Sequence, residues 1–119
     1  MYDHIGLKVR DLDASARFYT EALAPLGYVL GSRDKSSAGF GPPNAAALWL
    51  YLSKDAKGAG AHIAFTAPNH ASVKAFHVNG LKAGGRDNGG AGPRIDYSPT
   101  YYAAFLIDPD GNNVEAVCP

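Results

Sequence analysis

The chain has 119 residues, 46% of them hydrophobic, which suits one compact domain with its own core and excludes a disordered chain. Lys plus Arg and Asp plus Glu number 11 each, so the formal net charge is zero and we expect no nucleic-acid partner. One cysteine excludes an intrachain disulfide. No pattern of a signal peptide or of a membrane span is present, so we expect a cytoplasmic domain over residues 1–119.

The first half of the chain begins with a predicted strand and helix. Ile5, Leu7 and Val9 alternate with other residues at the two-residue period of a half-buried strand. Either Asp11 or Asp13 can cap the helix that follows. The apolar stripe of that helix recurs every four residues and consists of Ala14, Phe18, Ala22 and Leu26.

Further strands are expected before the middle of the chain. Residues 28–30 are a weak candidate, whereas Leu48, Leu50 and Leu52 alternate clearly with the residues between them. Residues 53–60 are polar and contain glycine, which is typical of a linker.

The second half repeats the order of strand and helix. Residues 62–66 alternate as a strand, Asn69 can cap a helix, and Gly84 with Gly85 can end it. The expected apolar face of this helix consists of Val73, Phe76 and Leu81.

The last third of the chain is predicted to be a loop followed by a hairpin. Residues 86–99 are rich in Gly and Pro, so we expect a loop with at most a short strand. Residues 101–107 and 113–118 alternate as strands on either side of a turn-forming cluster at 108–112.

An internal repeat orders these elements. Residues 4–7 (HIGL) resemble residues 62–65 (HIAF), which begin 58 positions later. Apolar helix residues match at the same offset: Phe18 with Phe76, and Leu23 with Leu81. We therefore predict an α+β domain of two βαβββ modules, about 1–56 and 57–119, with curled mixed sheets around a cavity and helices on the outer face.

The strand faces turned away from the aliphatic core carry the chemically distinctive side chains. On this face we place His4, Lys8, Trp49, Tyr51, Ser53, His62, Thr66, Asn113, Glu115 and Val117. If Phe105 lies opposite Glu115 in the hairpin, then Tyr101 shares the face. A register shift of one residue would bring Tyr102 there instead.

His4, His62 and Glu115 are the candidate metal ligands. A single histidine on a strand is more often structural, but two at matching places in a repeat, with a carboxylate on the same face, favour a metal site. Imidazole and carboxylate suit Fe, Mn, Zn or Ni. Such a site leaves positions open for a molecule that binds through two adjacent oxygens.

The sequence resembles the vicinal-oxygen-chelate superfamily, which contains glyoxalases, bleomycin-resistance proteins and extradiol dioxygenases. The resembling segments are 3–9 (DHIGLKV), 11–19 (DLDASARFY), 62–65 (HIAF) and 101–115 (YYAAFLIDPDGNNVE). The resemblance implies a pair of βαβββ modules around a metal cavity, within a homodimer. It assigns the metal ligands to His4, His62 and Glu115.

The same resemblance limits the function. Glyoxalase I uses a fourth ligand that falls near Trp49 here, so a typical glyoxalase I is not expected. We expect a metal-dependent enzyme, a lyase, dioxygenase or thiol transferase, acting on a small molecule that chelates a divalent metal through oxygen. The alternative is a metal-free, drug-sequestering protein of the bleomycin-resistance type. The candidate catalytic residues are Glu115 and Tyr101, and the candidate substrate-binding residues are Trp49, Tyr51, Tyr101 and Phe105.

Overall fold

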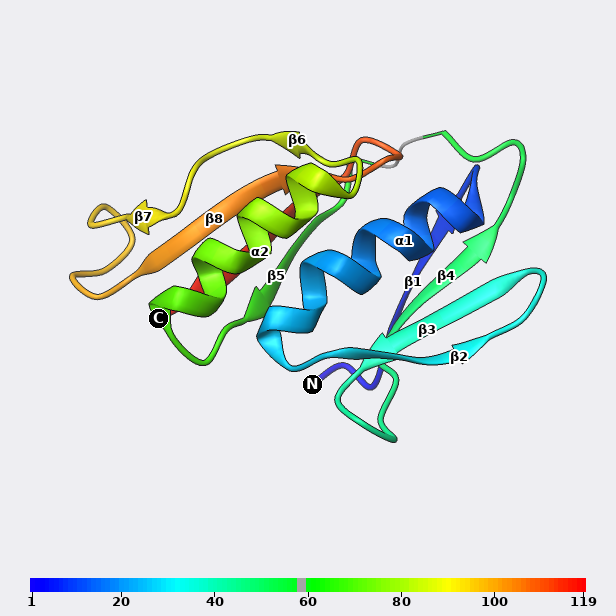
Figure 1. The fold of residues 1–119 in the computed structure, drawn as a ribbon, viewed down its shortest axis with the longest axis horizontal. Coiled ribbons are helices and arrows are strands. Elements are labelled where there is room, and N and C mark those ends of the chain that lie inside the picture. The colour runs from blue at the N-terminus through cyan, green and yellow to red at the C-terminus, as the bar shows by residue number, and fades with distance from the viewer. Residues whose placement is uncertain (58–59) are drawn as a thin grey trace.

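The computed structural model describes residues 1–57 and 60–119, and it places two sheets side by side with both helices on the same side of them (Figure 1). Residues 58 and 59 of the expected linker lie outside the described residues. No helix of the described part has the length and apolar character needed to cross a membrane. The elements are β1 (Ile5–Val9), α1 (Leu12–Leu23), η1 (Ala24–Leu26), β2 (Val29–Arg33), β3 (Ser37–Gly41), β4 (Leu48–Leu52), β5 (His62–Thr66), α2 (His70–Lys82), β6 (Arg86–Asp87), β7 (Gly92–Pro93), β8 (Tyr102–Ile107) and β9 (Asn113–Cys118).

Each module builds one mixed sheet. The strand order is β1-β4-β3-β2 in the first sheet and β5-β9-β8-β6 in the second, with β7 paired to β8. The first strand of each module runs parallel to its last strand, and the other pairs are antiparallel. This confirms the α+β fold of two βαβββ modules. β3, which the alternation does not reveal, pairs between β2 and β4.

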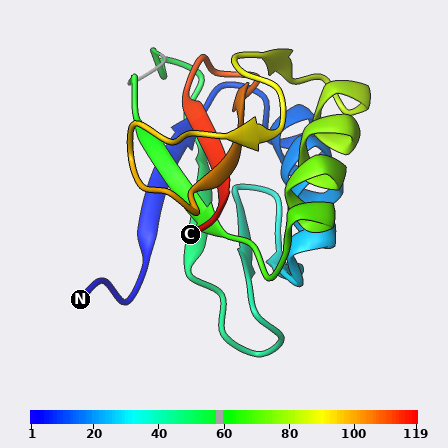
Figure 2. The same cartoon turned by 90° about the vertical axis from the view of Figure 1, so that its left-hand side faces the viewer.

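The helices begin where capping side chains satisfy free backbone N–H groups. Of the two candidates, Asp11 caps α1, since its Oδ1 accepts from Ala14 N at 3.0 Å. Asn69 caps α2 in the same way, accepting from Ser72 N at 2.8 Å. Figure 2 shows both helices on one side of the molecule and the strands on the other.

One expected core residue is wrong, because the buried face of α2 includes Gly80 in place of Leu81. Leu81 is 40% exposed. A Cβ at Gly80 would lie 2.2 Å from Leu106 Cδ1 and 3.3 Å from Phe18 Cε1. The missing side chain therefore lets α2 approach α1 and β8 closely, and this contact joins the two modules.

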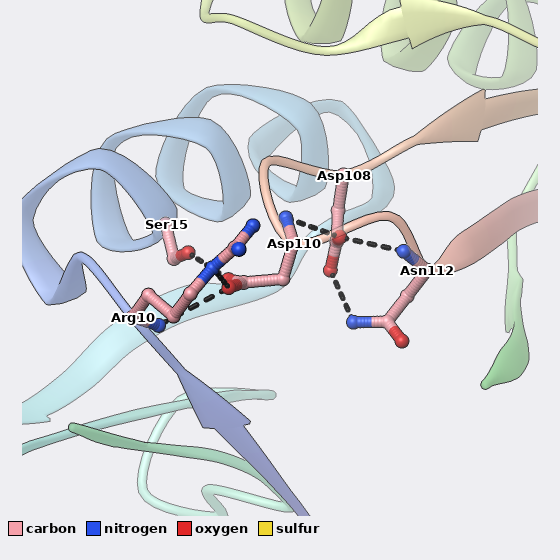
Figure 3. Close-up of polar contacts among 5 residues, drawn as sticks. All are labelled: Arg10, Ser15, Asp108, Asp110 and Asn112. Carbon is pink, nitrogen blue, oxygen red and sulfur yellow. Dashed lines mark hydrogen bonds and ion pairs between the residues drawn. The ribbon is translucent and has the colours of Figure 1, made fainter. Parts of the chain in front are cut away.

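A buried polar network also joins the modules (Figure 3). In the β8–β9 turn, Asp108 accepts from the backbone N–H groups of Asp110 and Asn112 at 2.9 and 2.8 Å. It also accepts from Asn112 Nδ2 at 3.0 Å and from Tyr19 OH on α1 at 2.5 Å. Asp110 accepts from Ser15 Oγ on α1 at 3.1 Å. The sequence predicts this segment only as a turn, whereas its carboxylates also bind the other module.

Candidate metal and substrate site

The carboxylate of Glu115 on β9 is the centre of the candidate site and is only 3% exposed. Val114 and Ala116 belong to the core under the helices, so strand alternation places Glu115 on the opposite face. A buried carboxylate needs polar partners, and both of its oxygens have one. Oε1 lies 2.9 Å from His62 Nε2, and Oε2 accepts a hydrogen bond of 2.5 Å from Tyr101 OH.

His62 is brought to Glu115 by the parallel pairing of β5 with β9. The register places His62 beside Asn113 and Ala64 beside Glu115. The His62 side chain is 52% exposed, and its ring packs at 66° against Phe105, with centroids 6.3 Å apart. His62 therefore contacts the buried carboxylate while its ring remains open to a ligand.

Tyr101 is held as a neutral phenol beside this pair. Its hydrogen bond to Glu115, together with burial and the negative charge of the carboxylate, raises the pKa of Tyr101 to about 12. Its ring also meets the ring of Tyr97 edge-on, with centroids 5.1 Å apart. Near neutral pH this phenol can therefore donate a hydrogen bond or a proton, but cannot act as a base.

The structure selects Tyr101 over Tyr102. Of the two registers considered for the hairpin, the structure has the one that pairs Phe105 with Glu115. Tyr102 instead stacks on His70 of α2, with ring centroids 3.9 Å apart and planes at 6°. Tyr101 and Phe105 thus share the face of Glu115, whereas Tyr102 packs against the helix.

His4 does not join His62 and Glu115 within one chain. It directly precedes β1, its side chain is 56% exposed, and its Nδ1 lies 2.7 Å from Asp3 Oδ1. Among residues 1–57 and 60–119, no group of three or more His, Cys, Asp or Glu side chains is placed to hold a metal ion. One chain therefore assembles two of the three predicted ligands.

Trp49 and Tyr51 lie on the first sheet, on strand β4. A Cβ at Gly39 would lie 2.8 Å from two atoms of the Trp49 ring, and one at Gly6 would lie 2.9 Å from the Tyr51 ring. The two glycines therefore leave room for these rings to lie close over the sheet backbone. The four predicted substrate-binding residues are thus divided between the two sheets.

A cavity of about 450 Å³ opens between β1 and β5. Its lining is mostly apolar and includes Ile5, Phe40, Ile63 and Phe65, with His4 among the polar contributors. A second hollow of about 410 Å³ lies beside Trp49. The first cavity follows the seam between the end strands of the two sheets and reaches Ala64 but not Glu115.

Two residues near the site carry no signal in the sequence. Asn88, just after β6, donates from Nδ2 to Asn113 Oδ1 at 3.1 Å. Arg94 lies 5.3 Å from the centroid of the Phe105 ring and donates to the carbonyls of Gly90 and Gly92 at 2.8 and 2.9 Å. Both come from the segment predicted as a loop, and only the pairing of β6 and β7 with β8 brings them here.

Comparison with known proteins identifies the class. The family model of the Glyoxalase/Bleomycin resistance protein/Dioxygenase superfamily matches residues 2–116, and the chain belongs to this superfamily. A glyoxalase/bleomycin resistance protein from Albidiferax ferrireducens T118 is 30% identical, with a TM-score of 0.81 over 98% of this chain and 97% of that one.

More distant solved structures share the fold. A glyoxalase-related enzyme from Fulvimarina pelagi is 22% identical, with a TM-score of 0.73 over 95% of this chain and 84% of that one. A putative glyoxalase from Bacillus halodurans is also 22% identical, with a TM-score of 0.73 over 100% of this chain and 96% of that one. Among curated proteins, the comparison finds no significant match.

Proposed function

We propose that this chain is a small metal-dependent enzyme whose substrate binds a divalent metal through oxygen atoms. The observation that supports this most directly is the contact of 2.9 Å between His62 Nε2 and Glu115 Oε1, beside the Tyr101 phenol. The pair lies on the sheet face away from the helices, where Phe105 supplies an apolar neighbour.

The donor set fits a divalent metal. Donors that share one ion at about 2.1 Å lie roughly 3 Å from each other, which is close to the separation of His62 Nε2 and Glu115 Oε1. One imidazole and one carboxylate suit Fe, Mn, Zn or Ni. When bound, the metal would supply positive charge that polarises a coordinated oxygen.

The protein's own residues would then handle protons and orientation. Glu115 is an acceptor with both oxygens engaged, and Tyr101 is a neutral donor directed at it. A substrate oxygen that replaces Glu115 as the acceptor would receive the hydrogen bond from Tyr101, which suits stabilisation of an enolate or alkoxide. Phe105 would contact the apolar part of the substrate.

A second copy of the chain would complete the site. β1 and β5 are end strands of their sheets, and open strand edges favour pairing with another chain. In such a homodimer, His4 of one protomer would join the His62–Glu115 pair of the other. Trp49 and Tyr51 would then form the opposite wall of a shared cavity.

The metal content of protein purified without chelators tests the enzyme proposal. We expect close to one divalent ion per chain in the wild type and nearly none in Glu115→Ala. His77→Ala is the matched control, because His77 lies on α2 and its ring contacts Asp87 at 2.9 Å. A wild type without metal, which also fails to bind added Zn, Mn, Ni or Fe, would contradict the proposal.

A second candidate function is metal-free binding of a planar small molecule. It is favoured by Trp49, whose ring lies over Gly39 beside a hollow of about 410 Å³. Stacking on an aromatic ring contributes about 0.5–1.5 kcal/mol beyond buried area. In this case Trp49→Ala should weaken the binding of aromatic compounds roughly 3- to 10-fold, measured by fluorescence or calorimetry. Under either candidate the variant should keep any metal that the wild type holds.

A further inference from the structure

A chain of hydrogen bonds approaches the side of His62 that faces away from Glu115. Asn113 Nδ2 lies 2.8 Å from His62 Nδ1, and Asn88 Nδ2 donates to Asn113 Oδ1 at 3.1 Å. Both amides are fixed at the backbone, since Asn113 N donates to Ala61 O at 2.9 Å and Asn88 N to Phe105 O at 3.1 Å. The imidazole is thereby held from both ring nitrogens.

The roles along this chain define one tautomer of His62. The Asn113 amide nitrogen can only donate, so Nδ1 accepts, and the ring proton lies on Nε2, where it is donated to Glu115 Oε1. A metal on Nε2 requires the opposite arrangement, with the proton on Nδ1. The ring does not need to turn for this change; only the proton has to move.

An amide can serve both tautomers from the same place. If the Asn113 side-chain amide rotates by half a turn, Oδ1 faces Nδ1–H. Asn88 then follows by presenting its own Oδ1 to Asn113 Nδ2. A carboxylate, which only accepts, or an apolar residue could not match both states of the ring.

We infer that Asn113, braced by Asn88, is the positioning residue for His62. It keeps the imidazole directed at Glu115 in the metal-free protein and accepts from Nδ1–H once Nε2 binds a metal. Partners of this kind fix ring orientation and tautomer, and their loss typically weakens metal binding about 10- to 100-fold. The metal part of this inference rests on the proposed function; the orientation of the ring does not.

The test combines nitrogen NMR of the histidine rings with zinc titration by calorimetry. In metal-free wild type, at about pH 8.5, where an ordinary imidazole is neutral, we expect the His62 proton on Nε2. The His62 signals are assigned with His62→Gln. Asn113→Leu should leave the proton on Nε2, where Glu115 still accepts it, but should shift the Nδ1 signal of His62, which loses its donor. The zinc Kd of this variant should be about 10- to 100-fold weaker. Asn113→Asp, which can accept from Nδ1–H, should restore most of the affinity. Asn88→Ala should fall between wild type and Asn113→Leu.

Asn79→Leu on α2 is the control and should leave both readouts unchanged, since Asn79 contacts Glu21 O on the helix side. Wild-type His62 signals and wild-type zinc affinity in Asn113→Leu would overturn the inference. If the wild type binds no zinc while Asn113→Leu still shifts the ring-nitrogen signals of His62, the positioning role is supported and the metal-dependent function fails.

Discussion

Trp49 occupies in the first sheet the position that Glu115 occupies in the second. Gly6, two residues after His4, pairs with Trp49, and Ala64, two residues after His62, pairs with Glu115. The indole nitrogen of Trp49 can donate a hydrogen bond but has no lone pair for a metal. Only one of two equivalent positions therefore carries a metal-binding side chain.

This equivalence predicts the absence of glyoxalase I activity. The resemblance to glyoxalase I implies that isomerisation of the methylglyoxal–glutathione adduct needs an acid–base residue at the position of Trp49 as well as one at the position of Glu115. We expect no substantial formation of lactoylglutathione with added Zn, Ni, Co or Mn, followed by absorbance. Clear turnover by the wild type would show that another side chain performs that role.

The second prediction concerns which chains share a site. Mixing His4→Ala with Glu115→Ala should restore one metal site per heterodimer. One of the two shared sites then takes an intact His4 from the Glu115→Ala chain and an intact His62 and Glu115 from the His4→Ala chain. Each variant alone should bind little metal. If the mixture also stays without metal, the three ligands do not come from two chains. Sedimentation that shows only a 12.5 kDa species at micromolar concentration would contradict the homodimer itself.

A third prediction concerns the phenol of Tyr101. The pKa of Tyr101 is raised to about 12 chiefly by its hydrogen bond to Glu115. In Glu115→Gln the carboxylate charge is gone, so the Tyr101 pKa should fall toward its ordinary value of 10.0. Carbon NMR of labelled tyrosines at about pH 11 checks this, because Tyr101 should stay protonated in the wild type and ionise in the variant. Equal titration of Tyr101 in both proteins would exclude the coupling.

The fourth prediction concerns the tie between modules. Burial and the neighbouring Asp108 raise the pKa of Tyr19 well above 10.0. The stability that this protonated phenol contributes is therefore complete below about pH 10 and is lost as the pH rises toward the folded pKa, because the unfolded chain ionises first. Tyr19→Phe should lower the free energy of unfolding by about 1.5–3 kcal/mol at pH 7, since a hydrogen bond to a charged group is lost.

Urea unfolding of both proteins at neutral and alkaline pH checks this prediction. The difference between wild type and Tyr19→Phe should shrink above about pH 10, where ionisation of Tyr19 begins to favour the unfolded wild-type chain. A difference that stays constant with pH would mean that Tyr19 contributes by packing alone. Tyr28→Phe is a suitable control, because Tyr28 OH donates to Thr66 O, a neutral acceptor.

Local sequence patterns were sufficient for most of the fold. The alternation in β1, β4, β5 and β9 depends only on which residues can be buried on one face of a strand. A helix cap is equally local, because the capping side chain binds a backbone N–H group three residues later. The internal repeat then fixed the order of elements. The turn left two registers open for the last hairpin, and the structure has the one that pairs Phe105 with Glu115.

Tertiary packing decided the rest. Gly80 lies in the core in place of Leu81, because α1, α2 and β8 converge at this point. No local pattern in the sequence shows how closely these three elements approach each other. Asp108 and Asp110 bind side chains of α1 in the other module, because α1 packs over the turn that carries them. The sequence by itself determined that His4, His62 and Glu115 each lie on or directly before a strand of the repeat. Only the tertiary structure decided that His62 meets Glu115 in one chain while His4 does not, because β5 and β9 pair within the second sheet whereas His4 precedes β1 of the first sheet.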